Sequence, residues 1–582
     1  MYQNINKEIA KIFKEMSHIY EFLDDKFRAI AYQRAAQALE DLPDDVRNYI
    51  KSGKLDDIRG IGSHTAEKIV EYVKTGKIQK YEELKKLVPP DFLKLMEVPG
   101  FGPKTLKRIY EELGISTKEE LIKALKDGRV AKLKGFGPKK VENMLKGLEL
   151  FEKSQQRLTL WEALEISNLL VEKLKKLKEV KNIEVAGSLR RKKETIGDID
   201  ILISCDEKDK EKVINYFVSL DDVKEVLAKG DTKASVIIKE KDRQVDLRVL
   251  KPEEWGSGLQ YFTGSKEHNV HLRDYAKSIG LKISEYGVFD AKTEKKIAGE
   301  TEEDVYRAVG MEWIPPELRE DRGEIEAALA KKLPKLVELS DIKGDFHCHS
   351  NWTDGYNTIL EIAQYVKENF NYEYLVLTDH SKAVRIAHGL TEDDVLRQIE
   401  EIDKVNKMIG FPLIKKGIEV DILLDGSLDL PDEILSKLDW VVASIHTHLN
   451  RDNTDRIIKA MENPYVNSIG HPTGRIIGSR EGYQFSDEIF KVAKETGTAL
   501  EINSQPLRMD LPDILVKKAV ENGVKLVISS DSHSLANFHY IQLGVYIARR
   551  GWAKKEDIIN TLSWKEVENF VKNKRKRFGV KV

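Results

Sequence analysis

Residues 185–203 (VAGSLRRKKETIGDIDILI) constrain the fold of this 582-residue chain more than any other stretch. Ile199, Ile201 and Ile203 are spaced by two, which predicts one apolar face of a β-strand. Because side chains alternate along a strand, Asp198 and Asp200 share the opposite face. Two adjacent carboxylates repel each other unless a cation lies between them. The segment therefore predicts a strand that presents two acids to a metal ion.

A glycine turn and a third acid fit the same plan. Gly187-Ser188 can bring backbone N–H groups close to a phosphate, and Arg191 adds positive charge. The segment 244–249 (QVDLRV) alternates in the same way, so its Asp246 points away from an apolar face. Three acids beside a phosphate-binding turn are what two-metal phosphoryl transfer requires. The alternative is two half-exposed strands whose acids are simply solvated.

A Gly-x-Gly turn that opens a helix occurs three times between residues 58 and 139. The glycines are Gly60 and Gly62, Gly100 and Gly102, and Gly135 and Gly137, with Lys104 after the second turn. Glycine lets the backbone approach a phosphate, and the helix N-terminus supplies free N–H groups. Three copies of this helix-hairpin-helix pattern predict sequence-independent contact with a nucleic-acid backbone. Ordinary helix-connecting turns are the alternative.

Charge and composition agree with a nucleic-acid partner. Residues 101–200 hold 23 Lys and Arg against 16 Asp and Glu, a net of +7, so the remainder of this chain of net charge −2 carries −9. A basic segment favours a polyanion-binding surface, with solvated helix faces as the alternative. The length predicts several domains. The two cysteines cannot form a disulfide framework, which favours a cytoplasmic protein, and no apolar run approaches the roughly 18 residues of a membrane span.

The C-terminal part is rich in histidine. Nine of the thirteen histidines lie after residue 343, where short apolar runs repeatedly end in a metal-type ligand. Seven such runs alternate with helical stretches, which predicts a parallel barrel. Ligands at the C-terminal ends of strands belong on the catalytic face of such a barrel. Imidazoles mixed with carboxylates suit zinc, manganese or iron better than magnesium alone.

These motifs together resemble a known family. Gly187-Ser188 followed by Gly197-Asp-Ile-Asp200 is similar to the signature of the polymerase beta-like nucleotidyltransferases. Tyr261-Phe-Thr-Gly-Ser265, with Asn269 and Arg273, narrows the resemblance to family X DNA polymerases. The C-terminal part resembles the polymerase and histidinol phosphatase (PHP) domain of bacterial and archaeal members. The resemblance covers nearly the whole chain.

The resemblance implies a multidomain fold. It comprises an all-α N-terminal helix-hairpin-helix region, an α+β nucleotidyltransferase palm with a thumb, and a C-terminal distorted parallel (β/α)7 barrel. We expect a lyase-like helical domain at 1–80, a fingers-like helical region at 81–182, the palm at 183–251, the thumb at 252–314, a linker with a charged helix from Glu317 to Leu339 at 315–342, and the PHP domain at 343–582.

For the palm and thumb, the resemblance implies that Asp198 and Asp200 bind both catalytic metals, Mg²⁺ or Mn²⁺, and that Asp246 binds one of them. Arg273 is expected at the template minor groove. Lys266 stands where vertebrate relatives have an acid. The implied nucleotide-binding residues are Gly187, Ser188, Arg191, Tyr261, Phe262, Gly264, Lys266 and Asn269.

The N-terminal module resembles the small lyase domain of family X. Lys68 matches the lysine that attacks the sugar aldehyde at an abasic site. Tyr32 and Lys80 match positions that hold the 5′-phosphate, and His64 stands where vertebrate relatives have a lysine. A nucleophilic lysine needs a lowered pKa. Lys68 is equally consistent with a solvated lysine or a contact to the DNA backbone.

In the C-terminal part, the resemblance to the PHP domain implies a cluster of three metal ions, Mn²⁺ or Zn²⁺, and Glu419 is the expected bridging ligand. A cluster of this kind activates water against a phosphoester. The nine implied ligands are His347, His349, Asp354, His380, Glu419, His446, His471, Asp531 and His533.

The leading hypothesis is a monomeric DNA-directed DNA polymerase that fills short gaps in base excision repair. It would use gapped or nicked duplex DNA and deoxynucleoside triphosphates, and its barrel would act as a 3′-5′ exonuclease or related 3′-end phosphoesterase. The first alternative is a metal-dependent DNA phosphoesterase or abasic-site endonuclease whose polymerase part mainly binds DNA. The second is a DNA-end scaffold in which both sites are silent. The three acids and the complete ligand set favour the leading hypothesis.

Overall fold

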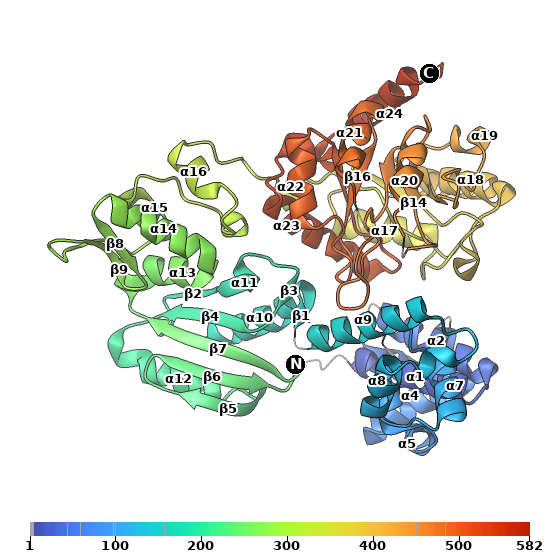
Figure 1. Cartoon of the computed structure of the whole chain (residues 1–582), viewed down its shortest axis with the longest axis horizontal. Helices are drawn as coiled ribbons and strands as arrows, with labels where there is room; N and C mark the ends of the chain where they lie inside the picture. Colours follow the sequence, from blue (N-terminus) through green and yellow to red (C-terminus); the bar gives the residue numbers. More distant parts are fainter. Residues whose placement is uncertain are drawn as a thin grey trace.

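The computed structural model describes residues 5–42, 45–58, 60–96, 98, 100–155, 157–449, 451–483 and 485–581. Figure 1 shows a helical N-terminal region, a palm sheet, a thumb and a C-terminal barrel in the order of the chain. This arrangement confirms the predicted fold class.

The N-terminal helices enclose one core. Ile9, Phe13 and Met16 of the first helix are completely buried, as their helical spacing predicts. Asp25 caps the second helix by accepting a hydrogen bond from the amide of Arg28. The elements are α1 (Ile5–Phe22), α2 (Lys26–Asp41), α3 (Val46–Ser52), η1 (Leu55–Asp57), α4 (Ser63–Thr75), α5 (Gln79–Lys85), α6 (Pro90–Leu95), α7 (Pro103–Leu113), α8 (Lys118–Lys126), η2 (Val130–Lys132) and α9 (Pro138–Gln155).

The palm is a five-stranded mixed sheet in the order β2-β4-β7-β6-β5, in which β4 and β7 run parallel. Two helices, α10 and α12, pack on the face that carries Ile201 and Leu247. The palm elements are β1 (Leu158–Thr159), α10 (Leu160–Leu174), β2 (Asn182–Val185), α11 (Gly187–Arg190), β3 (Thr195–Ile196), β4 (Ile199–Ser204), η3 (Glu207–Asp209), α12 (Lys210–Val218), β5 (Val223–Lys229), β6 (Lys233–Ile238) and β7 (Arg243–Leu250). Helix α10 lies in the segment that we predicted to be fingers-like, yet its buried residues belong to the palm core.

The thumb combines helices with a three-stranded antiparallel sheet in the order β10-β9-β8. Its core contains Leu272, Ile283 and Tyr306. The elements are η4 (Pro252–Glu254), α13 (Trp255–Thr263), α14 (Lys266–Ser278), β8 (Leu281–Ser284), β9 (Gly287–Asp290), β10 (Lys296–Ala298) and α15 (Glu302–Ala308).

The predicted charged helix from Glu317 to Leu339 is wrong. The segment instead forms three short helices, η5 (Pro316–Leu318), α16 (Glu324–Leu329) and η6 (Leu339–Asp341). Gly323, with φ of +100°, separates the first two. Leu318, Ile325 and Leu336 of this segment are buried in the thumb core. The segment therefore packs as part of the thumb.

A buried ion pair explains why Arg319 of this segment does not face water. Arg319 is completely buried, and its guanidinium donates to Glu302 Oε1 at 2.7 Å and to the carbonyl of Ile314 at 2.8 Å. Arg190 of the palm makes a second pair with Glu302 at 2.7 Å. Burial would raise the pKa of Glu302, but the two arginines reverse that effect and lower it to about 2. The Glu302 carboxylate thus joins the thumb, the palm and the 315–342 segment.

The C-terminal barrel has seven parallel strands in sequence order, β11 to β17, as predicted. The edge strands meet beyond their ends through a parallel bridge between Cys348 and Ser532. The strands are β11 (Gly344–Asp345), β12 (Tyr374–Leu377), β13 (Ile414–Asp421), β14 (Trp440–Ser444), β15 (Ser468–Ile469), β16 (Ala499–Asn503) and β17 (Leu526–Ser529). The helices are α17 (Ile359–Asn369), η7 (Arg385–Ala387), α18 (Glu392–Ile409), α19 (Asp432–Leu435), α20 (Thr454–Met461), α21 (Asp487–Thr496), α22 (Asp513–Glu521), η8 (Leu535–Tyr540), α23 (Ile541–Arg550), η9 (Lys555–Asp557), η10 (Ile559–Thr561) and α24 (Trp564–Arg577). None of the helices in the described ranges has the length and apolar content needed to cross a bilayer.

The buried pair gives a stability prediction. Arg319→Ala leaves the buried Glu302 carboxylate with one fewer counter-charge, so we expect a loss of about 3–5 kcal/mol in the free energy of unfolding. Arg307→Ala is the matched control, because that side chain is 75% exposed and pairs with Asp304 on the surface. The control should cost less than about 1 kcal/mol. Denaturant titration followed by circular dichroism measures both, and equal losses would contradict the prediction.

Candidate metal centres

Two palm acids lie directly opposite each other on neighbouring strands. Asp200 of β4 and Asp246 of β7 are register partners, and Asp198 is exposed just before β4. Burial raises the pKa of Asp200 to about 6, and the charges of Asp246 and Asp198 add to the effect. The strand alternation predicted from the sequence therefore holds, and the three acids share one electrostatic environment.

The glycine turn touches this acid pair. Gly187 has φ of +59°, and a Cβ built on it would lie 2.4 Å from Asp200 Oδ2. The amide of Ala186 donates to the carbonyl of Asp200 at 2.9 Å, which fixes the turn to β4. Ser188 follows in the short helix α11 and is partly exposed. Only glycine fits at position 187, because a side chain would strike the carboxylate.

The palm donor set fits a divalent cation by its chemistry. Carboxylate oxygens are the ligands that Mg²⁺ and Mn²⁺ prefer. A cation would also offset the burial and the neighbouring negative charges that raise the pKa of Asp200. The ligand atoms of the three palm acids do not form one of the compact groups found among the described residues, however. Among the described residues, the groups whose ligand atoms lie within 4.8 Å of one another all belong to the barrel.

Arg191 does not face the acids. Its Nε donates to Glu320 Oε1 at 2.9 Å, and its Nη1 donates to the carbonyl of Thr263 at 2.6 Å. A Cβ on Gly264 would lie 3.1 Å from the same Nη1, so Gly264 leaves room for the guanidinium. Arg550 of the barrel donates to the Arg191 carbonyl and pairs with Glu320. In this structure Arg191 therefore belongs to a buried network between the palm, the thumb and the barrel.

The aromatic pair of the thumb packs against the palm. Tyr261 and Phe262 are half-buried at the end of α13, with their ring centroids 5.1 Å apart in a T-shaped arrangement. The Arg248 guanidinium lies 4.3 Å above the Phe262 ring. Asn269 of α14 donates its amide to the Tyr261 carbonyl at 2.8 Å. The structure thus brings three of the predicted nucleotide-binding residues together.

Lys266 and Arg273, the two predicted ligand-contacting cations of α14, lie on its accessible surface. Lys266 is exposed in the first turn of the helix. Arg273 is also exposed, and its Nε donates to the carbonyl of Asn269 at 3.2 Å. Both side chains are therefore accessible to a ligand from solvent.

The three Gly-x-Gly turns have the same geometry. Gly60, Gly100 and Gly135 adopt positive φ values of +97°, +90° and +84°. In each turn the amide of the residue between the glycines donates, at 3.0 Å, to the carbonyl two residues before the first glycine. The second glycines, Gly62, Gly102 and Gly137, lead directly into α4, α7 and α9. The predicted turn-and-helix repeat is confirmed, although Arg59 and Pro99 of these motifs lie outside the described residues.

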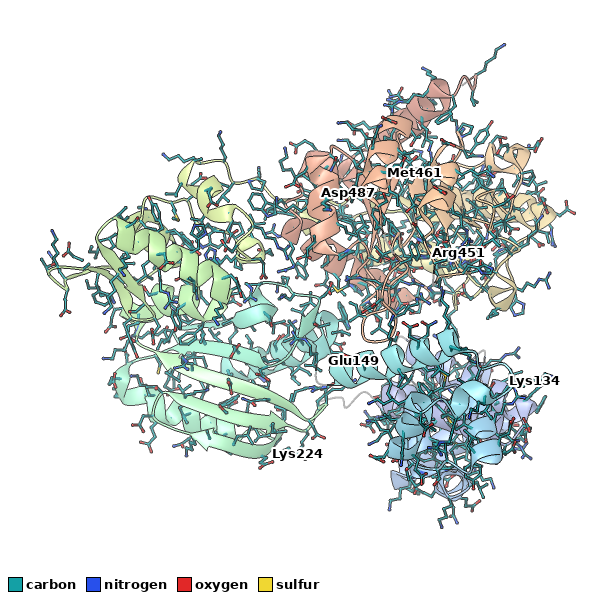
Figure 2. The ribbon with its side chains drawn as sticks, in the orientation of Figure 1. Lys134, Glu149, Lys224, Arg451, Met461 and Asp487 are labelled. Atoms are coloured by element: carbon teal, nitrogen blue, oxygen red, sulfur yellow. The ribbon has the colours of Figure 1, made fainter. Side chains whose placement is uncertain are left out.

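Cations flank these turns on the surface. Lys104 is exposed in the first turn of α7, and its Nζ lies 3.7 Å from Glu21 Oε1. Lys134 is exposed beside the third turn, and Figure 2 shows it at the edge of the N-terminal region. The exposed helix starts and cations together form a surface that can approach phosphates.

The predicted lyase residues have unequal environments. Lys68 is on α4, where its Nζ donates to Glu71 Oε2 at 3.2 Å, and Lys80 pairs with Glu83 at 3.0 Å on the surface. Tyr32 is buried in the core against Phe13 and Tyr20. Burial raises the pKa of its hydroxyl to about 12. The Tyr32 ring therefore packs in the core, whereas the two lysines remain accessible.

The nine predicted barrel ligands converge at the C-terminal ends of the strands. Eight of them form three groups able to hold an ion: His349, Asp354, His380 and His533; His347, His349 and Asp531; and His380, Glu419 and His446. His471 joins them through its Nε2, which lies 3.0 Å from Glu419 Oε1. The clustering was predicted from the repeated strand–ligand pattern, and the structure brings the whole set together.

Buried nitrogens without a hydrogen-bond partner show that this donor set could hold metal ions. His347 Nε2 and His349 Nδ1 are buried and have no hydrogen-bond partner among the described residues. A buried polar atom without a partner is costly unless an ion or another group binds it. The residues present therefore fit a cluster of divalent cations.

The electrostatics of the cluster follow from burial and mutual charge. Burial would raise the pKa of Glu419, but His347, His380 and His446 reverse this and hold it well below its usual value. Burial, together with the neighbouring charges of His533 and His380, lowers the pKa of His349 to about 3. His349 is therefore neutral near pH 7, which is the form that binds a metal.

Two acids that the sequence did not single out orient the ligands. Glu501 Oε1 is 2.6 Å from His347 Nδ1, and Asp421 Oδ1 is 2.8 Å from His446 Nδ1. A carboxylate on one ring nitrogen turns the other toward the metal and fixes the tautomer. A charged residue inside an otherwise apolar strand, as in ALEIN of β16, was the available signal.

The remaining barrel histidines stay outside the cluster. His388 and His448 are exposed, and His539 Nε2 lies 3.1 Å from the Tyr365 hydroxyl. None of these three is among the grouped ligands of the described residues.

Family profiles match most of the polymerase part. The DNA polymerase beta palm profile matches residues 157–249, and the DNA polymerase beta thumb profile matches 258–320. A helix-hairpin-helix domain profile matches 4–78, and a SAM-like helix-hairpin-helix tandem profile matches 52–114 and 92–149. With the fold and the ligand sets, these matches define a polymerase beta-type nucleotidyltransferase joined to a metal-binding barrel.

Curated relatives cover both parts. The DNA polymerase/3′-5′ exonuclease PolX of Bacillus subtilis (strain 168) is 38% identical over 572 residues, which is 97% of this chain and 99% of that protein. A probable phosphatase of Thermoanaerobacter sp. (strain X514) is 30% identical over 251 residues, 40% of this chain and 96% of that protein. A probable phosphatase of Acetivibrio thermocellus is 29% identical over 32% of this chain and 78% of that protein. The chain therefore belongs to the PolX-type family X DNA polymerases.

The raised pKa of Asp200 predicts a pH-dependent stability of the metal-free protein. An unfolded aspartate has a pKa of about 3.9, so the folded state holds the Asp200 proton more tightly between that value and about 6. The contribution of this proton to stability is present below pH 4 and is lost as the pH rises through 6. Asp200→Asn removes the dependence. In EDTA, the variant should exceed the parent in stability by up to about 3 kcal/mol at pH 7.5 and match it at pH 4.

Calorimetry of the unfolding transition that includes the palm measures this difference. Asp231→Asn, at an exposed acid of the same domain, is the matched control. A gap between Asp200→Asn and the parent that stays constant from pH 4 to 7.5 would contradict the prediction.

Proposed function

We propose that this protein is a DNA-directed DNA polymerase that fills short gaps and carries a separate 3′-5′ exonuclease or 3′-end phosphoesterase site in its barrel. The observation that supports the polymerase assignment most directly is the placement of Asp200 opposite Asp246, with Gly187 against Asp200. The relationship to PolX of Bacillus subtilis supports both activities. Base excision repair in the cytoplasm is the setting that such a pair of activities serves.

In the palm, Asp198 and Asp200 would hold two Mg²⁺ or Mn²⁺ ions, and Asp246 would hold the ion nearest the primer 3′-hydroxyl. The backbone amides of the turn at Gly187 and Ser188 would donate hydrogen bonds to the triphosphate. Tyr261, Phe262 and Asn269 would border the sugar and base.

DNA contact follows from the N-terminal region. The helix starts at Gly62, Gly102 and Gly137 would bind the phosphates of a gapped or nicked duplex. The side chains of Lys104 and Lys80 would also contact phosphates. Arg273 would approach the template strand.

In the barrel, Glu419 would bridge two of three ions. Its Oε2 lies within 3.7 Å of His347, His349 and His380 nitrogens, and its Oε1 lies within 3.3 Å of His446 and His471 nitrogens. When bound, Mn²⁺ or Zn²⁺ ions would lower the pKa of a water molecule and offset the charge of the phosphoester. Asp354 and His533 would complete the outermost ion site.

The two sites predict separable activities. Asp246→Asn removes a metal ligand of the palm, so nucleotide addition should fall at least about 100-fold, while degradation from the 3′ end continues. His349→Gln loses a ligand shared by two of the barrel groups. This variant should lose degradation from the 3′ end and keep nucleotide addition. A gapped, end-labelled duplex incubated with Mn²⁺, with and without nucleotides, reports both activities on one gel.

The same gel distinguishes the alternative. If Asp246→Asn extends the primer as well as the parent does, the palm is a DNA-binding platform and the chain is a DNA phosphoesterase or abasic-site endonuclease. Loss of both activities in either variant, with unchanged circular dichroism, would contradict the two-site assignment.

Lys68 is proposed as a 5′-deoxyribose-phosphate lyase nucleophile. Its place on α4, directly after the first Gly-x-Gly turn, supports this role. Borohydride reduction with a 5′-deoxyribose-phosphate duplex should crosslink the parent protein, and Lys68→Ala should lose the crosslink. Lys74→Ala, on the same helix, is the matched control. Absence of trapping in the parent would leave Lys68 as a backbone-contact residue.

A further inference from the structure

One loop of the barrel reaches the palm. It follows β15, begins at the ligand His471 and ends before α21. Figure 1 shows this orange loop extending from the barrel toward β1 and β3 of the palm. At its palm end, Arg475 makes a bidentate pair with Glu194, with Nη–Oε distances of 3.2 and 2.6 Å. Glu194 directly precedes β3 and lies four residues before Asp198.

Arg475 joins three segments at this point. Its Nε donates to the carbonyl of Arg508 at 2.9 Å, and its Nη2 donates to the carbonyl of Met509. Only 15% of the Arg475 side chain is exposed. The guanidinium therefore connects the palm, the His471 loop and the segment that follows β16.

The segment after β16 leads directly to the metal ligands. The Asp510 carboxylate accepts hydrogen bonds from the amide of Thr473, two residues after His471, at 3.1 and 3.2 Å. The Asp510 backbone pairs with Asn503, whose side-chain amide donates to Asp531 Oδ2 at 2.9 Å. Glu194 is thus connected to two ligands, His471 and Asp531, by a short series of hydrogen bonds.

Packing next to the ion pair is incomplete. A cavity of about 600 Å³ separates the outer part of the loop from the palm. Its walls include Arg157, Thr195 and Lys241 of the palm, and Ile477 and Arg480 of the loop. The ion pair therefore borders this cavity, and Glu194 is the palm group that bonds Arg475 there.

We propose that Glu194 of the palm is a positioning residue for the metal centre of the barrel. It fixes Arg475, which in turn fixes the loop that presents His471 and the segment that supports Asp531. The 3′-end phosphoesterase site is completed by the polymerase domain, although all nine of its ligands come from the barrel. The functional part of this inference rests on the proposed phosphoesterase activity.

The first test uses the full-length chain without metal, so that it does not depend on activity. Glu194→Ala should accelerate amide hydrogen exchange in residues 472–483 by about tenfold, because opening of the loop no longer breaks the pair. The amides of Ile476 and Ile477, which donate to Arg480 and Leu507, are direct reporters. Lys241→Gln is the matched control, because it breaks a 2.8 Å pair with Glu162 at the same cavity without touching Arg475. The control should leave the loop exchange unchanged.

The second test separates positioning from folding. Residues that orient metal ligands typically change metal affinity or activity about 10–100-fold. In Glu194→Ala, kcat for 3′-end hydrolysis should fall about tenfold with KM for DNA unchanged, and gap filling should continue at the parental rate. Glu194→Asp, which keeps the carboxylate, should recover most of the hydrolysis. Metal analysis should show weaker retention in the Ala variant than in the Asp variant.

Each outcome decides a separate question. Parental loop exchange and parental kcat in Glu194→Ala would overturn the inference. Equal loss of gap filling and hydrolysis would also overturn it, since that result indicates general destabilisation. If the parent shows no 3′-end hydrolysis, the proposed function fails, while the exchange rates still test the connection between Glu194 and the loop.

Discussion

The barrel depends on one buried carboxylate. Glu419 is 1% exposed, and nitrogens of five histidines surround it at 2.9–3.7 Å. An ionised carboxylate removed from water is stable only when paired or bound to metal. The seven parallel strands meet this requirement because their C-terminal ends point to one face, so residues far apart in the sequence converge there. The acids Glu501 and Asp421 then orient two of the rings.

The palm also brings negatively charged acids together, but it uses fewer ionisable residues than the barrel. Asp200 and Asp246 face each other because β4 and β7 are parallel and in register, and Gly187 allows its turn to approach Asp200 closely. Burial, with a further contribution from the charges of Asp246 and Asp198, raises the pKa of Asp200, and a bound cation would favour its ionised form. Both sites therefore use the same principle: the fold brings negative charge together, and the cations that carry out the chemistry neutralise it.

Local periodicity predicted much of this architecture. Alternation along 199–203 placed Asp200 on the correct face, and the glycine spacing predicted three turns that have the same geometry. Long-range pairing was not predictable in this way. Arg191 looked like a phosphate ligand, yet it pairs with Glu320, 129 residues later. The 315–342 segment was predicted to be a linker with one charged helix, and only the tertiary structure supplies the Glu302 carboxylate that lets Arg319 be buried. Sequence patterns show which faces are apolar, but they do not show which distant charge compensates a buried one.

The domains are joined by charge rather than by a large apolar interface alone. Arg550 of the barrel pairs with Glu320 and Asp513, and Arg191 shares Glu320, with all four side chains at most 12% exposed. Removing one member of such a buried set typically costs about 3–5 kcal/mol, because it leaves a charge without a partner. A triphosphate that drew Arg191 toward the palm acids would have to break its pair with Glu320 and replace it with a pair of similar strength. If Arg191 binds the triphosphate as the family resemblance implies, nucleotide binding in the palm and docking of the barrel would use the same guanidinium, and the two parts would be coupled through Arg191.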